Sequence, residues 1–195
     1  MIVFFTLLFL WLSAFVIAGP RFGPAEDTDP RYREKELIRP DGYRTWVFVG
    51  ANIGLRYSKE DKSTTERESD RHKDSEIGDF HNVYINPKAY DQFKKNGTFP
   101  DGTVLVMDVY ESKDREPKGI VEKGFFPGKQ KEIEVAVKDS KRPDGAKEDW
   151  AYYIFPPDKK TAMAMPKVAC YECHLKHGKT DNVWVQFYPT LRDKR

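Results

Sequence analysis

Apolar and β-branched residues gather in short runs, and polar connections containing proline or glycine separate these runs. Runs of this length and composition predict β-strands. The clearest is 103–110, where two-residue alternation places Leu105, Met107 and Val109 on one face of a sheet. Asp108 then faces the opposite side, and we expect the surroundings of Met107 to be apolar. The other predicted strands are 46–49, which Gly50 should break, 80–85, 133–137 and 151–155.

Helical patterns are brief in this chain. Pro87 suits the first turn of a helix, and Asn96-Gly97 suits its end. A second short helix is expected beside the turn at 40–42, and the polar stretch 57–79 is predicted to be a solvated loop. Short strands in succession with short helices between them predict an α+β fold of mainly β character. Its core would be an antiparallel sheet, with one helix carrying the motif at 170–174.

The N-terminus differs from the rest of the chain. Residues 2–18 carry no charge and are rich in large apolar side chains, which predicts a signal peptide or an N-terminal membrane anchor over 1–19. The pattern does not decide whether this segment is cleaved, because no Lys or Arg precedes the apolar run and the small-residue cleavage site at Ala18-Gly19 is weak. We expect 20–35 to be a linker and 36–195 the folded domain. Both a signal peptide and a membrane anchor predict a periplasmic protein, and an anchor would also hold it at the inner membrane.

Charge and composition narrow the class of protein. The chain has 33 basic and 31 acidic residues, so no global positive field argues for nucleic-acid binding. Its 13 Phe, 10 Tyr and 4 Trp residues favour a compact domain with charged loops over a disordered chain.

Candidate chemistry centres on Cys170, Cys173 and His174, which form a Cys-x-x-Cys-His motif from the two cysteines of the chain. This pattern attaches c-type haem: each thiol adds across a vinyl group, and the adjacent imidazole becomes the proximal iron ligand. Export favours this interpretation, because the attachment takes place outside the cytoplasm in bacteria.

Other interpretations of the motif explain less. A zinc site that adds His177 would crowd four ligands into eight residues, whereas zinc modules set their ligand pairs further apart. A redox dithiol of the thioredoxin kind needs a βαβ unit, which the strand pattern does not predict. A simple disulfide would leave His174 without a role.

Separate blocks of the chain, taken in order, resemble the cytochrome P-460 family. The similarity runs from about Glu36 to Arg192 and rests on FHNVYINP at 80–87, DGTV at 101–104, VKDSKR at 137–142, WAYYIF at 150–155, CYECH at 170–174, KTD at 179–181, FYP at 187–189 and LR at 191–192. The resemblance implies a periplasmic, mainly β domain, commonly a homodimer. It also implies one covalently bound haem c, with His174 as the iron ligand and an open distal side.

One position departs from the family pattern. Members of the P-460 type oxidise hydroxylamine, and a lysine of theirs is cross-linked to the haem at the position that Met107 occupies here. A thioether cannot make this amine cross-link. Relatives without the lysine, called cytochrome c′-β, bind nitric oxide and carbon monoxide in an apolar distal pocket. They are the closer functional model, so we expect a mono-haem c-type cytochrome that binds nitric oxide or a similar small ligand.

Three residues are candidates for the distal side of the haem. Met107 either fills the core or approaches the haem, even as a sixth iron ligand. His81 is either an interstrand or surface histidine, or a hydrogen-bond donor or ligand at the iron. Met165 is expected to line the pocket. Two further functions therefore stay open: an electron-transfer cytochrome with Met107 or His81 as sixth ligand and a redox partner protein, and a hydroxylamine or nitric oxide oxidoreductase.

Overall fold

The computed structural model describes residues 28–55, 77–114, 120 and 124–193. The predicted N-terminal segment, most of the predicted polar loop and His72 within it lie outside this part of the chain. No helix among the described residues combines the length and the apolar character that crossing a membrane requires.

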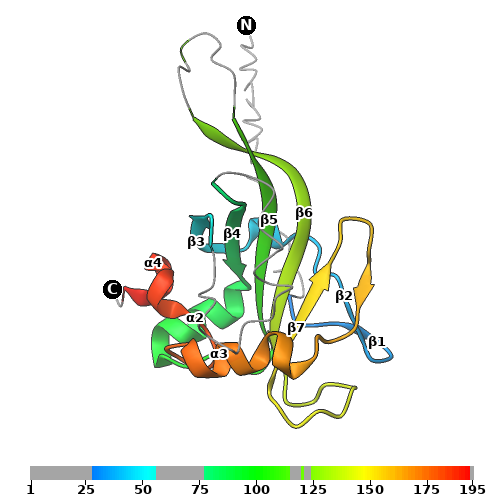
Figure 1. Ribbon diagram of the computed structural model, residues 1–195. Coiled ribbons are helices and arrows are strands. Elements are labelled where there is room, and N and C mark those ends of the chain that lie inside the picture. The colour runs from blue at the N-terminus through cyan, green and yellow to red at the C-terminus, as the bar shows by residue number, and fades with distance from the viewer. Residues whose placement is uncertain (1–27, 56–76, 115–119, 121–123, 194–195) are drawn as a thin grey trace, which may run out of the picture.

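A five-stranded antiparallel sheet forms the body of the molecule (Figure 1), and a smaller three-stranded sheet accompanies it. The mainly β, α+β prediction is therefore confirmed. The large sheet has the order β3-β4-β5-β6-β7, with β3 Val47–Ile53, β4 Phe80–Ile85, β5 Thr103–Asp114, β6 Phe125–Lys138 and β7 Trp150–Phe155. The small sheet contains β1 Tyr32–Arg33, β2 Glu36–Ile38 and β8 Thr161–Ala162. Pairing into a sheet thus begins at Tyr32, inside the segment 20–35.

Short helical segments connect and cover the strands. They are the 3-10 helices η1 Tyr43–Thr45, η2 Lys167–Ala169 and η3 Val185–Phe187, and the α-helices α2 Pro87–Asn96, α3 Tyr171–His177 and α4 Pro189–Arg192. The predicted start and end of α2 are confirmed: Pro87 lies in its first turn and Gly97 closes it in the left-handed conformation. Figure 1 shows α2 and α3 at the same end of the sheet.

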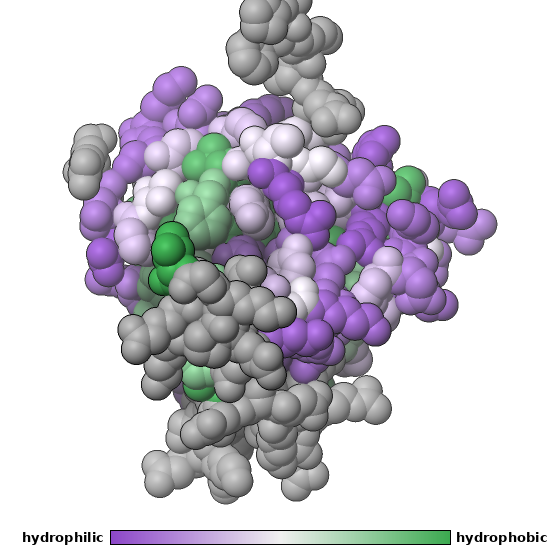
Figure 2. All heavy atoms as spheres, turned by 90° about the horizontal axis from the view of Figure 1, so that it is seen from above, coloured by the Kyte–Doolittle hydropathy of each residue, from purple (hydrophilic) through white to green (hydrophobic). Residues whose placement is uncertain are grey.

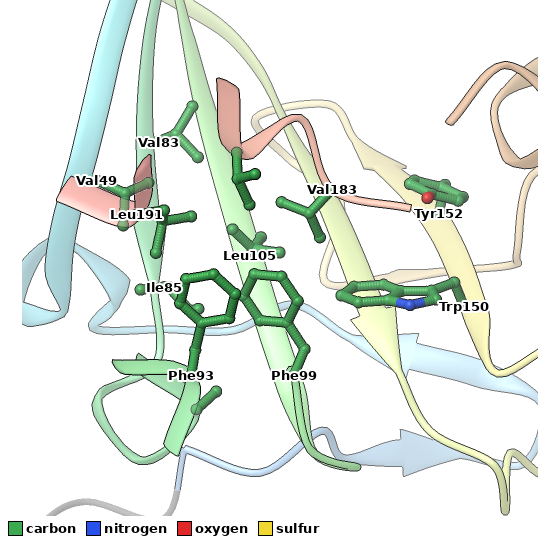
Figure 3. Packing of buried hydrophobic residues seen from close by; sticks show 12 residues of the cluster. Val49, Val83, Ile85, Phe93, Phe99, Leu105, Trp150, Tyr152, Val183 and Leu191 are labelled. Carbon is green, nitrogen blue, oxygen red and sulfur yellow. The ribbon is translucent and has the colours of Figure 1, made fainter. Parts of the chain in front are cut away.

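The strand alternation divides the core into two clusters, one on each face of the large sheet. Leu105 belongs to the first cluster, which also includes residues of α2 and of the C-terminal segment. Val104 and Val106 belong to the second cluster, on the opposite face. In the first cluster the rings of Phe93 and Phe99 are stacked, with centroids 4.2 Å apart. Figure 3 labels both rings within the cluster. The first cluster lies on the face that carries the candidate site.

Two strands are longer than predicted. β5 continues to Asp114 and β6 begins at Phe125, so the two strands pair beyond the end of their neighbours. Figure 1 shows this hairpin extending beyond the rest of the sheet. Seen along that direction, the surface is mainly hydrophilic, with small hydrophobic areas between charged residues (Figure 2).

The expectation that Gly50 breaks its strand is wrong. β3 continues through Gly50 to Ile53, with a register shift between Phe48 and Gly50. A Cβ atom at this position would lie 3.2 Å from Tyr188 Cδ1 and 3.3 Å from Pro189 Cδ. The absence of a side chain at Gly50 therefore lets α4 pack closely on the strand. Close approach of another part of the backbone is one of the reasons for which glycine occurs within strands.

The end of the predicted polar loop is also not solvated as expected. Asp79 is buried, with 2% of its surface exposed, and its carboxylate accepts a hydrogen bond from Lys131 Nζ at 3.0 Å. An ion pair with a strand of the sheet explains how a charged residue is buried here.

Candidate functional site

The Cys-x-x-Cys-His motif begins at the N-terminal end of α3. Cys170 precedes the helix and is half-buried, whereas Cys173 lies within it and is buried. Residues three apart on a helix lie on the same side, so the two thiols can reach one bound group together. The structure does not join Cys170 and Cys173 in a disulfide, which does not support the disulfide interpretation.

The imidazole of His174 has a defined orientation. Its Nδ1 lies 2.9 Å from the backbone oxygen of Asn182. A carbonyl oxygen only accepts hydrogen bonds, so Nδ1 carries the proton and Nε2 keeps its lone pair. The ring is stacked on Trp184 with a centroid distance of 4.7 Å and an interplanar angle of 7°. It also contacts Tyr152, with a centroid distance of 4.4 Å.

The protonation state of His174 suits a metal ligand. Burial lowers the pKa of His174 to about 4, and the hydrogen bond to Asn182 opposes this shift in part. The imidazole is therefore neutral at pH 7. A neutral ring with Nδ1–H bonded to a carbonyl is the usual form of a metal-binding histidine.

His174 and Cys170 border a cavity between the large sheet and the C-terminal segment. Its empty volume is about 740 Å³, including the open space at its mouth. Cofactor pockets are lined mostly by apolar side chains with a few polar groups. The sheet contributes Val83, Leu105, Met107, Glu134, Val135, Ala136, Tyr152, Tyr153 and Ile154, and the C-terminal segment contributes Asn182, Val183, Trp184 and Tyr188.

Met107 lines this cavity, but its surroundings are not wholly apolar as predicted. In the sheet it pairs with Val83 on one side and with Glu134 on the other. Glu134 itself lines the cavity, so a carboxyl group lies beside the thioether. Burial, with a smaller contribution from Glu134, raises the pKa of Tyr188 to about 12. The expectation was wrong because it rested on the alternation within 103–110 alone. The pairing of β5 with β6 places the carboxyl group of Glu134 beside Met107.

His81 is fully buried on the same face of the sheet, two residues from Val83 along β4. Its Nδ1 lies 2.7 Å from the amide oxygen of Asn52 on β3, so it donates a hydrogen bond between strands. His81 is not among the described residues that line the cavity. The structure therefore brings Met107, but not His81, to the cavity wall that His174 also borders.

Met165 lies beside the cavity and not on its lining. It is half-buried, and it packs against the same hydrophobic cluster as Met107 and Cys170. Its backbone N–H donates to the oxygen of Tyr152 at 2.7 Å, which fixes the chain before the motif to β7.

The zinc interpretation finds no support in the geometry of the described residues. They contain no group of three or more His, Cys, Asp or Glu side chains placed to hold a metal ion. His177 is exposed on the surface of α3, while His174 is half-buried and stacks on Trp184.

A sequence profile of the cytochrome P-460 family matches residues 40–185. The chain belongs to this family. No curated protein matches it. As a member of the cytochrome P-460 family the protein is a haem cytochrome, and the cavity residues fit such a group. The thiol of Cys170 and the neutral imidazole of His174, with Nε2 available, border a largely apolar space, and Cys173 lies three residues further along the same motif. This donor set fits c-type attachment.

Sequence reasoning missed several residues of this cytochrome P-460 site. Trp184 and Tyr152 enclose the imidazole, Asn182 accepts its hydrogen bond, and Glu134 and Tyr188 add polar groups to the cavity. The alternation in β6 could have indicated Glu134, since it places Glu134 on the same face as Ala136. The contact of Asn182 with His174 has no comparable signal in the sequence.

Proposed function

We propose that this protein is a periplasmic cytochrome that carries one covalently attached haem c and binds nitric oxide or a similar small ligand at the haem iron. Cys170 and Cys173 would attach the haem through thioether bonds, and His174 would bind its iron through Nε2. The bound haem supplies an iron centre with which a diatomic ligand can combine.

One observation carries this proposal. Among the described residues that line the cavity, His174 alone carries an imidazole, and Val83, Leu105 and Ala136 form an apolar wall on the sheet. A second strong nitrogen ligand is therefore not presented to the cavity by these residues. An open sixth position in apolar surroundings favours binding of an uncharged diatomic gas.

The test is the optical and EPR spectrum of the protein co-expressed with a cytochrome c maturation system, before and after addition of nitric oxide. A high-spin, five-coordinate iron that takes up nitric oxide is expected. A low-spin iron that is indifferent to nitric oxide would contradict the proposal.

The position of Met107 favours a second candidate function, electron transfer. Its thioether borders the same cavity as His174, and a thioether ligand raises the reduction potential of a haem. The variant Met107→Leu keeps the volume and removes the sulfur. If Met107 is the sixth ligand, this variant changes a low-spin spectrum to a high-spin one, whereas His81→Gln leaves the spectrum low-spin.

The carboxyl group of Glu134 favours a third candidate, oxidation of hydroxylamine or a related nitrogen compound. A carboxylate beside the reacting ligand can accept the protons that such an oxidation releases. Met107 lacks the amine of the family cross-link, so this candidate requires turnover without that modification. Hydroxylamine oxidation by the holoprotein, lost in Glu134→Gln, would support this candidate, and absence of turnover would exclude it.

A further inference from the structure

Two successive residues beside the motif have an unusual backbone conformation. Asp181 has φ 48° and Asn182 has φ 61°, both in the left-handed region. Asp and Asn adopt this region more readily than other non-glycine residues, and two successive residues in it form the tight two-residue turn that the pairing of Thr180 with Val183 closes. Outside this pair, Glu34 is the one non-glycine residue with positive φ among the described residues. The turn sets the local conformation of the pair, and a restraint from outside the turn is needed to set its position against the sheet.

The carboxylate of Asp181 supplies that restraint. One oxygen accepts a hydrogen bond from Trp150 Nε1 at 3.0 Å, and the other accepts from Lys138 Nζ at 2.6 Å. Lys138 also donates to the backbone oxygen of Phe99 at 3.0 Å. The 3.0 Å bond from Trp150 is within the usual range, and the bond from Lys138 is short and joins two charged groups.

The two donors are themselves held rigidly. Lys138 and Trp150 are paired across β6 and β7 in the large sheet. Trp150 is 3% exposed and its ring packs edge-on against Phe99 at 6.1 Å. The sheet and the first hydrophobic cluster (Figure 3) thus fix the position of the Asp181 carboxylate.

The restrained pair presents a backbone oxygen to the motif. The oxygen of Asn182 accepts from His174 Nδ1 at 2.9 Å, and the Tyr152 hydroxyl lies 3.5 Å from the same oxygen. Hydrogen bonds between Thr180 and Val183 close the turn around the pair. A continuous set of contacts therefore connects the sheet, through Asp181, to the imidazole.

We propose that Asp181 is a positioning residue that sets the ligand strength of His174, by holding the Asn182 carbonyl against Nδ1. This inference rests on the proposed function, in which His174 is the axial ligand of the haem. A hydrogen bond from Nδ1 to a fixed acceptor makes the imidazole a stronger donor, and partners of this kind commonly change metal affinity about 10- to 100-fold. A stronger donor stabilises ferric over ferrous iron and lowers the reduction potential.

The test compares Asp181→Asn and Lys138→Met in the holoprotein. Both variants weaken the restraint, so both are expected to lower the frequency of the iron–histidine stretching band in resonance Raman spectra of the ferrous protein. Both should also raise the reduction potential. A tenfold loss of ferric over ferrous stabilisation corresponds to about 59 mV for one electron.

The sign of the potential change separates positioning from simple electrostatics. Removal of the Asp181 charge alone would raise the potential, whereas removal of the Lys138 charge alone would lower it. A rise in both variants therefore requires the positioning role. A fall in Lys138→Met, or an unchanged iron–histidine band in both variants, would overturn the inference.

Two further variants complete the experiment. Trp150→Phe removes the second donor without a change of charge and should shift the band in the same direction, which keeps the inference testable if Asp181→Asn does not fold. Glu148→Gln is the matched control, because it removes a carboxylate that pairs with Lys167 just before the motif and should leave the band unchanged. Loss of covalent haem from the unsubstituted protein would instead refute the proposed function itself, and a haem stain after denaturation detects that outcome.

Discussion

The half-buried imidazole of His174 predicts a specific acid sensitivity of the haem-free protein. Burial lowers the pKa of His174 from 6.5 to about 4. The unfolded chain therefore binds a proton at this residue at a higher pH than the folded chain does. The contribution of neutral His174 to stability is complete above pH 6.5 and is lost as the pH falls from 6.5 to 4. At about 1.4 kcal/mol for each pH unit, the loss amounts to about 3 kcal/mol.

The assay is urea unfolding of a haem-free protein, the double variant Cys170→Ser with Cys173→Ser, measured from pH 7 to pH 4. In this background His174→Gln keeps a donor for the Asn182 carbonyl but removes the titrating group. We expect the variant to lose less stability on acidification, by about 3 kcal/mol. His177→Gln, on the exposed surface of the same helix, is the control and should retain the original pH dependence. An identical loss of stability with and without His174 would refute the argument.

Three further predictions concern the motif, the packing and the buried charge. The double variant Cys170→Ser with Cys173→Ser should abolish covalent haem, and haem retained through a denaturing gel would contradict the attachment. Gly50→Ala should lower the free energy of unfolding by about 1–3 kcal/mol, because the new Cβ meets Tyr188 and Pro189, and an unchanged melting temperature would contradict that packing. Arg44→Ala should cost about 1–3 kcal/mol in urea unfolding, because Asp108 is 1% exposed and its carboxylate loses the hydrogen bond from Arg44 Nε at 2.9 Å, while Tyr110 and Gln130 still donate to it. Lys88→Ala, which removes the partner of the exposed Asp29, should cost less than about 1 kcal/mol, and equal costs would refute the role of burial.

Local patterns in the sequence determined the fold class and the centre of the site. The two-residue alternation in 103–110 correctly assigned Leu105 and Met107 to one face of the sheet and Asp108 to the other. Pro87 and Gly97 correctly indicated the ends of α2. The Cys-x-x-Cys-His motif lies at α3 and borders the cavity, and the family indicated by the separate sequence blocks is confirmed. These features depend on neighbouring residues, which is why they can be predicted without the tertiary structure.

Tertiary structure alone decided which distant groups meet at the cavity. The pairing of β5 with β6 places Glu134 beside Met107, and a one-residue slip would have turned this side chain to the opposite face. The same sheet positions Lys138 and Trp150 on Asp181, and through it the Asn182 carbonyl on His174. Composition and alternation indicate which face a residue occupies, but the strand register and the path of the C-terminal segment determine its neighbours. Those depend on the packing of the whole chain, so the sequence alone indicated His174 as the candidate ligand and not the contacts that orient it.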